Sequence, residues 1–443
     1  MTVNEGEEWA AEHDFGLRED PAEREQVLEQ ARSGIEHHRK SPLTLRLLGP
    51  DGAALPGRAL ELEQTGHAFD FGCSAASTVA AEADPAIKAR NQLFCKLFNC
   101  TTAKCYWDEK WHQPIEHVQG QRVTSTFLAE VDWARANGLR VRGHPLVWTV
   151  DKAIPAWVKR YDYERQLRLV EENCRSLIGA AGGRVQLWDL VNEALWEPSL
   201  RHLAERDWPH IETTEEMLTY IEPALGWARD EDPDARYVIN DYGLEVNNTT
   251  MKGVTAAKQR QRFVELAQAL VERGCAPDAL GTQAHVGKWF PMSAVQQSLD
   301  DLASTGLPVQ VTEYWAHFKS CPGIDELSEA DQREEQARYV RDFYTVVFGH
   351  PATDHLTFWG GKEFFDRKGY VPSRLYRALD ELINGAWRSQ GQYQTDQDGV
   401  VSDRVFQGDY RLRWRDRHGR QHSRDLQVAP GASTTLELRL PEC

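Results

Sequence analysis

Between about residues 68 and 382, short apolar runs alternate with longer stretches whose apolar positions recur with the period of an α-helix. This alternation is typical of repeated strand–helix units. Eight of the apolar runs have the length of strands, and they cover residues 68–73, 97–101, 140–147, 185–191, 237–239, 279–283, 309–312 and 355–359. The amphipathic stretches between them include residues 127–137, 165–178, 259–273 and 332–347. Eight parallel strands with following helices close into a TIM (β/α)8 barrel, so we predict an α/β fold of that type.

The segments on either side of this region follow other patterns. A helix is expected over residues 21–38, before a strand–turn–strand over 43–62. Alternating strands such as 409–414 and 434–440 close the chain. We therefore predict three parts, which are an N-terminal helix with a small β appendage (1–66), the barrel (67–384) and a small antiparallel β module (385–443). The last part could bind sugar, but we favour packing against the N-terminal β segment at the bottom of the barrel.

Two of the predicted strands end in a glutamate. The sequence Trp-Asp-Leu-Val-Asn-Glu ends at Glu193, and Val-Thr-Glu ends at Glu313. In a TIM barrel the catalytic groups lie at the C-terminal ends of the strands. A pair of carboxylic acids there is the minimum apparatus for hydrolysing a glycosidic bond, because one protonates the leaving oxygen and the other attacks or stabilises the sugar cation.

Polar and aromatic side chains also follow most of the other strands. They are His144, Trp148, Asn192, Asn240, Tyr242, Gln283, His285 and Trp359. Each of these residues alone has a structural explanation, such as a hydrogen-bonded core histidine or a packed tryptophan. Their occurrence at nearly every strand end favours a shared cleft.

The motifs at these strand ends resemble those of glycoside hydrolase family 10, the xylanase-type retaining β-glycosidases. They are Gly-His-Pro-Leu-Val-Trp at 143–148, Trp-Asp-Leu-Val-Asn-Glu at 188–193, Asn-Asp-Tyr at 240–242, Gly-Thr-Gln-Ala-His at 281–285, Val-Thr-Glu at 311–313 and Phe-Trp at 358–359. The resemblance implies that Glu193 is the acid/base, that Glu313 is the nucleophile and that Asn192 binds the sugar 2-hydroxyl. It also implies a set of residues that hold the sugar in the cleaving subsite, namely His144, Trp148, Gln283, His285 and Trp359. No metal or organic cofactor is expected.

The two glutamates need different protonation states for this reaction. Glu313 must be ionised to attack, and we expect His285 and Gln283 to donate hydrogen bonds that lower its pKa. Glu193 must begin protonated, and we expect Trp188 and Trp196 to desolvate it and raise its pKa.

The end of the second strand departs from the family pattern. The family usually carries Glu-Asn…Lys-Trp there, which grips the sugar one step further from the cleaved bond, and residues 98–107 lack the Glu-Asn pair. We predict instead that Tyr106, Trp107 and Trp315 contact the substrate. Together with Tyr314, Phe364 and Phe365 they would make a more apolar cleft. Such a cleft would suit a short glycoside, or an aryl or terpenoid aglycone, better than a xylan chain, unless these rings only pack at the rim.

We therefore predict a retaining glycoside hydrolase that cleaves β-linked plant-type saccharides by double displacement through a covalent glycosyl-enzyme. Its substrate would be xylan, xylo-oligosaccharides or small β-glycosides. One alternative is an exo-acting or disaccharide-releasing hydrolase of aryl or terpenoid β-glycosides. Another is a carbohydrate-binding barrel without turnover.

Composition narrows the partners and the compartment. The net charge of −17 disfavours nucleic acid and anionic membrane surfaces as partners. The acidic N-terminus has no signal-peptide pattern and no run reaches the length of a membrane span, so a cytoplasmic location is expected unless a leader has been removed. The eight scattered cysteines fit a reducing compartment, with a bridge between Cys100 and Cys105 left open. The oligomeric state is open.

Overall fold

A closed parallel β-barrel lies at the centre of the computed structural model. The structure describes residues 19–74, 84–110, 112–196, 200, 213–245, 254–286, 289–316, 324–365, 371–416 and 418–440. The barrel strands are β3 (Asp70–Cys73), β4 (Cys100–Lys104), β5 (Arg140–His144), β7 (Leu187–Asn192), β8 (Arg236–Asp241), β9 (Ala279–Thr282), β11 (Val309–Ala316) and β12 (Thr353–Phe358). Each pairs in parallel with the next, and β12 returns to β3. The predicted TIM barrel is confirmed, with short β6 (Val147–Trp148) and β10 (His285–Val286) continuing two of its strands.

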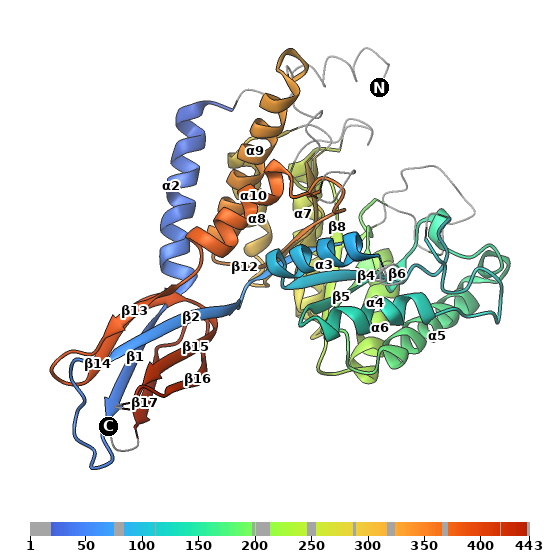
Figure 1. Ribbon diagram of the computed structural model, residues 1–443. Coiled ribbons are helices and arrows are strands. Elements are labelled where there is room, and N and C mark those ends of the chain that lie inside the picture. Colours follow the sequence, from blue (N-terminus) through green and yellow to red (C-terminus); the bar gives the residue numbers. More distant parts are fainter. Residues whose placement is uncertain are drawn as a thin grey trace.

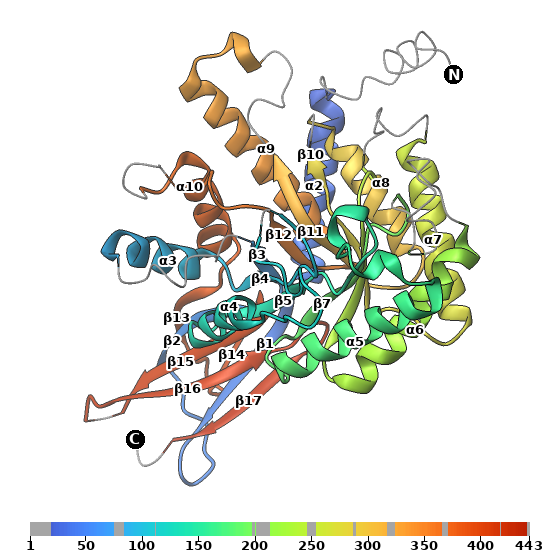
Figure 2. The same cartoon turned by 90° about the vertical axis from the view of Figure 1, so that its right-hand side faces the viewer.

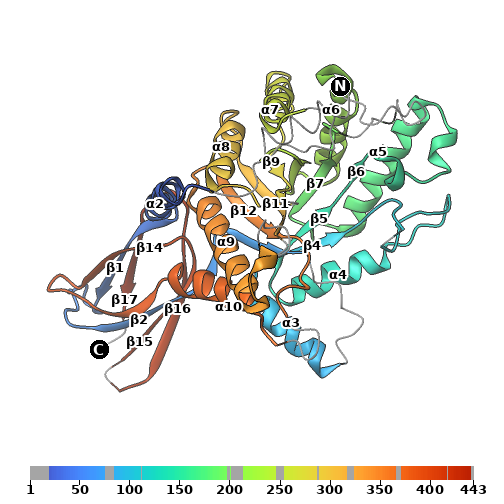
Figure 3. The same ribbon diagram turned by 90° about the horizontal axis from the view of Figure 1, so that it is seen from above.

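Helices surround this ring of strands, as Figures 2 and 3 show. They are α3 (Pro85–Leu97), α4 (Ser125–Ala136), α5 (Tyr163–Ala181), α6 (Thr214–Glu231), α7 (Ala256–Glu272), α8 (Met292–Ala303), α9 (Glu329–Gly349) and α10 (Arg374–Asp380). The short helical turns are η2 (Asp151–Ala153), η3 (Val158–Arg160), η6 (Ile324–Glu326) and η7 (Glu381–Ala386). No helix within the described ranges is both long and apolar enough to span a membrane.

Two local signals place helices where the sequence analysis expected something else. Thr213 and Glu216 form a capping box that starts α6. The acidic, aromatic and proline residues over 197–222 predict a long irregular connection, but its last part is helical, and residues 197–199 and 201–212 lie outside the described residues. Asp84 caps α3, which runs to Leu97, so the second barrel strand begins at Cys100. The strand predicted over 97–101 is therefore shifted, and Lys104 is its last residue.

The β segments at the two ends of the chain form one module (Figure 1). In one sheet β1 (Lys40–Leu48) lies between β14 (Val400–Phe406) and β17 (Thr434–Arg439). The other sheet has the order β13-β2-β15-β16, with β2 (Ala59–His67), β13 (Gln390–Gln394), β15 (Gly408–Arg415) and β16 (Gln421–Val428). The two sheets share an apolar core of their own. Strands of the two terminal segments share both sheets, so the parts that were predicted separately as 1–66 and 385–443 form one β module.

The module lies at the end of the barrel where the strands begin. The Phe406 ring lies 6.2 Å from that of Phe348, near the C-terminal end of α9, and Ala68 donates its backbone N–H to Gln407 just before β3. The six cysteines of the described residues are free thiols, so the bridge considered between Cys100 and Cys105 is not formed. The strand ends that carry the predicted site residues are at the opposite end of the barrel.

Helix α2 (Pro21–His38) connects the module to the barrel by packing against α9 (Figure 1). The helices approach closely at Gly34, where an added Cβ would lie 2.2 Å from the Gly349 carbonyl oxygen. Arg24 also donates its Nε–H to Asp342 on α9 at 2.8 Å. A side chain at position 34 would therefore push the helices apart.

We expect Gly34→Ala to lower the free energy of unfolding by about 1–3 kcal/mol, as overpacking usually does. The matched control is Gly226→Ala within α6, where no atom lies within 4 Å of the added Cβ. That variant should gain up to about 1 kcal/mol from helix propensity. Thermal unfolding of both variants measures the difference, and equal behaviour of the two would contradict the close α2–α9 contact.

Candidate active site

Glu193 and Glu313 lie at the same end of the barrel, one directly after β7 and the other near the end of β11. Glu193 has a φ of 62°, in the left-handed region that residues other than glycine rarely adopt. Its backbone N–H donates to the Asn240 carbonyl oxygen at 2.7 Å, which helps to hold this conformation. Ala284, with a φ of 50°, makes a similar bend between Gln283 and His285. Strained backbone of this kind concentrates at functional sites.

Three buried amide side chains connect the two glutamates, and we call Asn192, Asn240 and Gln283 the amide bridge. Asn240 donates its Nδ2–H to Glu313 Oε1 and to Asn192 Oδ1, both at 2.9 Å. Gln283 donates its Nε2–H to Glu193 Oε1 at 2.9 Å and to Asn192 Oδ1 at 3.3 Å. The side-chain oxygen of Asn192, Oδ1, is thus the shared acceptor. The side-chain nitrogen of Asn192 has no partner among the described residues.

The surroundings of Glu313 favour its ionised form. Burial alone would raise its pKa, but the charge of His144 and the hydrogen bond and charge of His285 outweigh burial, so the pKa is lowered. The His285 Nε2 lies 3.1 Å from Glu313 Oε2, and the pKa of His285 is raised because this bond and charge outweigh its own burial. The expected contact from His285 is present. The hydrogen bond predicted from Gln283 to Glu313 is wrong, because the Gln283 amide donates to Glu193. The amide that donates to Glu313 is that of Asn240.

Glu193 has the opposite electrostatic surroundings. Its pKa is raised, first by burial and then by the negative charge of Glu313, and these outweigh its hydrogen bonds from neutral donors. One donor is Gln283, and the other is Trp148, whose Nε1–H lies 2.7 Å from Glu193 Oε2.

The tryptophans that were expected to desolvate Glu193 make other contacts. Trp188 lies between Gly143, whose added Cβ would meet the indole ring, and Phe127 of helix α4. Neighbouring residues of a strand face opposite sides of a sheet, so its side chain is directed to the helices outside the barrel. Trp196 stacks on Tyr242 with ring centroids 5.7 Å apart and donates to its carbonyl oxygen.

A buried ion pair lies beneath the glutamates and orients His144. Arg142 and Asp189 form this pair with almost no exposure, and Arg142 also donates to Gln310 Oε1 at 2.8 Å. Asp189 Oδ2 accepts from His144 Nδ1 at 2.7 Å, and His144 Nδ1 is 3.9 Å from Glu313 Oε1. Arg142 and Asp189 were not predicted as site residues, although a charged residue inside an apolar barrel strand is a signal in the sequence.

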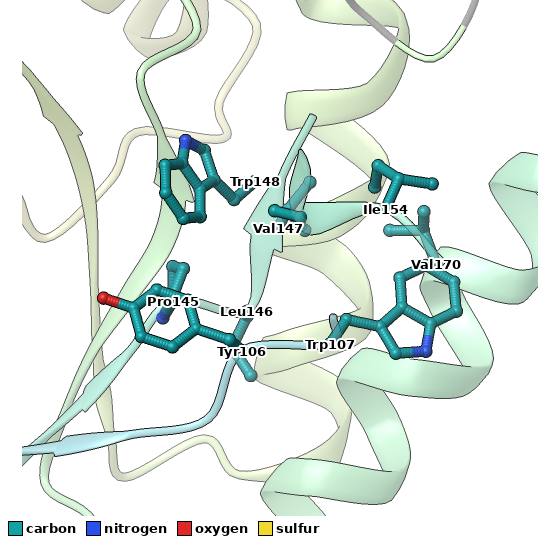
Figure 4. A pocket seen from close by; sticks show the side chains of 9 residues that line it. Tyr106, Trp107, Pro145, Leu146, Val147, Trp148, Ile154 and Val170 are labelled. Carbon is teal, nitrogen blue, oxygen red and sulfur yellow. The ribbon is translucent and has the colours of Figure 1, made fainter. Parts of the chain in front are cut away.

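The predicted aromatic contacts divide into two groups. Tyr106 lies in the cleft wall, with its ring 5.6 Å from that of His144 and 5.5 Å from that of Trp148. Trp107 is directed to the other side, toward Ile154 and Val170 (Figure 4), with its ring 5.9 Å from that of Trp157. Its predicted role in substrate stacking is therefore wrong, and Trp107 packs behind the cleft.

The same division holds at the other side of the barrel mouth. Trp359 is half-buried, with its ring 5.1 Å from that of His144, and the half-buried Trp315 pairs with His285 between β10 and β11. Tyr314 is fully buried and stacks on Phe343 at 3.8 Å, because it follows Glu313 in the strand and faces the helices. Phe364 and Phe365 are buried too. The cleft is therefore less apolar than predicted.

Comparison with known proteins identifies the family. A model of glycosyl hydrolase family 10 matches residues 62–374. The chain belongs to glycosyl hydrolase family 10.

Individual relatives are distant. The chain is 24% identical over 397 residues to the anti-sigma-I factor RsgI6 of Acetivibrio thermocellus, covering 87% of this chain and 46% of that protein. It is 28% identical over 317 residues to the endo-1,4-beta-xylanase C of Paenibacillus barcinonensis, covering 67% and 28%. It thus spans less than half the length of either relative. A solved family 10 structure from Paenibacillus barcinonensis has the same fold, with a TM-score of 0.58 and 24% identity over 72% of this chain and 96% of that one.

Two substitutions should move different limbs of the pH profile of kcat/KM. His285→Ala removes a cation and a donor that lower the pKa of Glu313, so the acid limb should move to higher pH. Trp148→Phe removes a donor that lowers the pKa of Glu193, so the basic limb should move to higher pH. Initial rates on an aryl β-xyloside between pH 3 and about 10 test both shifts. A shift of the same limb in both variants would contradict the assigned roles.

Proposed function

We propose that Glu193 and Glu313 hydrolyse β-glycosidic bonds with retention of configuration, by double displacement. The observation that carries the proposal is the opposite displacement of their pKa values, raised for Glu193 and lowered for Glu313, within one hydrogen-bonded frame. Pairs of carboxyl groups whose pKa values are pushed apart are typical of an acid and a nucleophile acting together.

In the first step the Glu313 carboxylate attacks the anomeric carbon while Glu193 gives its proton to the leaving oxygen. The glycosidic C–O bond breaks, and an ester joins the sugar to Glu313. The ester no longer carries the negative charge that raises the pKa of Glu193, so the ionised Glu193 becomes the stable form. In the second step Glu193 takes a proton from water, the water oxygen attacks the anomeric carbon, and the Glu313 carboxylate leaves.

The remaining site residues would bind and orient the sugar. The amide nitrogen of Asn192 has no partner within the described ranges, and we assign it to the 2-hydroxyl. His144 presents Nε2 for a hydroxyl, since Asp189 holds its Nδ1. The half-buried rings of Trp359, Trp315 and Tyr242, with the buried Tyr106, offer faces for the sugar. Asn240 is fully buried with its amide already bonded, so it positions Glu313 and does not touch the substrate.

A xylan-type β-linked saccharide is the substrate class that we favour. Two relatives of the chain are endo-1,4-beta-xylanases, one from Paenibacillus barcinonensis and one from Thermotoga neapolitana. An apolar cleft would favour an aryl or terpenoid aglycone. Four of the aromatic side chains expected there are buried, namely Trp107, Tyr314, Phe364 and Phe365. The alternative of a sugar-binding barrel without turnover predicts affinity with no product.

Azide rescue of two alanine variants tests the proposal. Glu193→Ala should lower kcat/KM by about 10²–10⁴-fold on poor leaving groups, and azide should restore turnover of a dinitrophenyl β-xyloside as the β-glycosyl azide. Glu313→Ala should give the α-glycosyl azide, because azide then attacks from the face that Glu313 vacates. Nuclear magnetic resonance of the products distinguishes them.

The control is Glu265→Ala on the exposed face of α7, which should keep wild-type rates. Wild-type protein that binds xylo-oligosaccharides without releasing reducing ends would support the binding barrel instead. Azide products of the same anomeric configuration from both variants would contradict the assigned roles.

A further inference from the structure

Lys104, the last residue of β4, presents a half-buried cation at the barrel mouth. Its Nζ lies 3.1 Å from His112 Nε2 and 4.8 Å from the centre of the Trp359 ring. Among the described residues no ion pair includes this ammonium, and the nearby Glu130 carboxylate accepts from the backbone N–H of Lys104. Cations that are withdrawn from water are usually paired with an anion, so the missing partner indicates a place for a ligand.

A second residue, His112, fixes the direction of this ammonium. Glu109 Oε2 lies 3.0 Å from His112 Nδ1, and a carboxylate only accepts hydrogen bonds. His112 therefore carries its proton on Nδ1, and its Nε2 lone pair accepts from Lys104. The pKa of His112 is lowered, first by burial, which agrees with a neutral ring beside the Lys104 cation. Since an ammonium has three donors, N–H groups remain for a ligand.

The position of Lys104 places it on the glycone side of the cleft. It lies over Trp359, whose ring contacts those of His144 and His285, and these two histidines are the cations or donors beside Glu313. The leaving group departs on the side of the acid Glu193. There a different lysine, Lys152, lies 4.6 Å over the Trp148 ring.

We propose that Lys104 determines specificity by binding a carboxylate on the glycone, so that the enzyme takes β-linked saccharides with a uronic acid on the glycone side. The inference rests on the proposed function. One ammonium matches a single negative charge. A doubly charged phosphate would meet more repulsion from Glu130, Glu313 and Glu109, which all act on the Lys104 charge. The Trp359 ring beside the ammonium can contact the glycone sugars that carry the carboxylate toward Lys104.

Two substrates that differ in one group test this. They are 4-nitrophenyl β-xylosides extended at O4 by β-glucosyl or by β-glucuronosyl, which exchange a hydroxymethyl group for a carboxylate. Wild type should hydrolyse the glucuronosyl substrate with a kcat/KM about tenfold higher. Lys104→Met should abolish this ratio, Lys104→Arg should keep a preference for the acid, and 0.5 M NaCl should reduce it. The matched control Lys152→Met should leave the ratio unchanged.

Equal rates on both substrates in wild type, or equal losses on both in Lys104→Met, would overturn the inference while the proposed hydrolysis stands. Calorimetric binding of the two free disaccharides, glucosyl-xylose and glucuronosyl-xylose, separates recognition from turnover. If neither nitrophenyl substrate is hydrolysed, the proposed function is contradicted. Tighter calorimetric binding of glucuronosyl-xylose than of glucosyl-xylose, lost in Lys104→Met, would then still support carboxylate binding by Lys104. Binding of both disaccharides with equal affinity would contradict the inference.

Discussion

The site depends on the two hydrogen bonds that the side-chain oxygen of Asn192 accepts. This oxygen accepts hydrogen bonds from Asn240 and Gln283, and through them it fixes one oxygen of Glu313 and one of Glu193. The five residues lie in or directly after the adjacent parallel strands β7, β8, β9 and β11, so the barrel brings them together at one edge. Because all three amides are buried, none can turn away without leaving a donor unsatisfied, which would cost about 1–3 kcal/mol. This stiffness explains how Glu193 can keep a left-handed backbone.

The residues around the amide bridge also shift the pKa values of the two glutamates in opposite directions. Glu313 faces two histidines, one of them held by the buried Asp189 and Arg142. Glu193 receives only neutral donors, an indole and an amide. Burial acts on both carboxyl groups in the same direction, so the charge of the neighbours decides which one ionises first. The opposite pKa shifts of two identical side chains thus follow from the residues that the strands place beside them.

The sequence alone predicted the barrel and the position of the two glutamates at its strand ends. Both depend on short stretches of neighbouring residues, which carry the strand pattern and the polar residues that follow each strand. The prediction failed where the answer depended on distant residues or on side-chain direction. The interleaving of β1 between β14 and β17 requires a pairing across most of the chain. The Gln283 amide donates to Glu193 and not to Glu313, which depends on its side-chain direction. Tyr314 could have been excluded from the cleft by alternation with Glu313, and Lys104 could have been included had the capped helix before β4 been recognised.

The most direct measurement of the central claim is the mass of the protein after reaction with a dinitrophenyl 2-deoxy-2-fluoro-β-xylobioside. The fluorine slows both steps and the activated leaving group restores the first, so a covalent intermediate should accumulate. If Glu313 is the nucleophile, the protein mass increases by one glycosyl unit. The peptide that contains Glu313 carries this increase, and the Glu313→Ala variant does not show it. Release of dinitrophenol without an adduct, or an adduct on another residue, would contradict it.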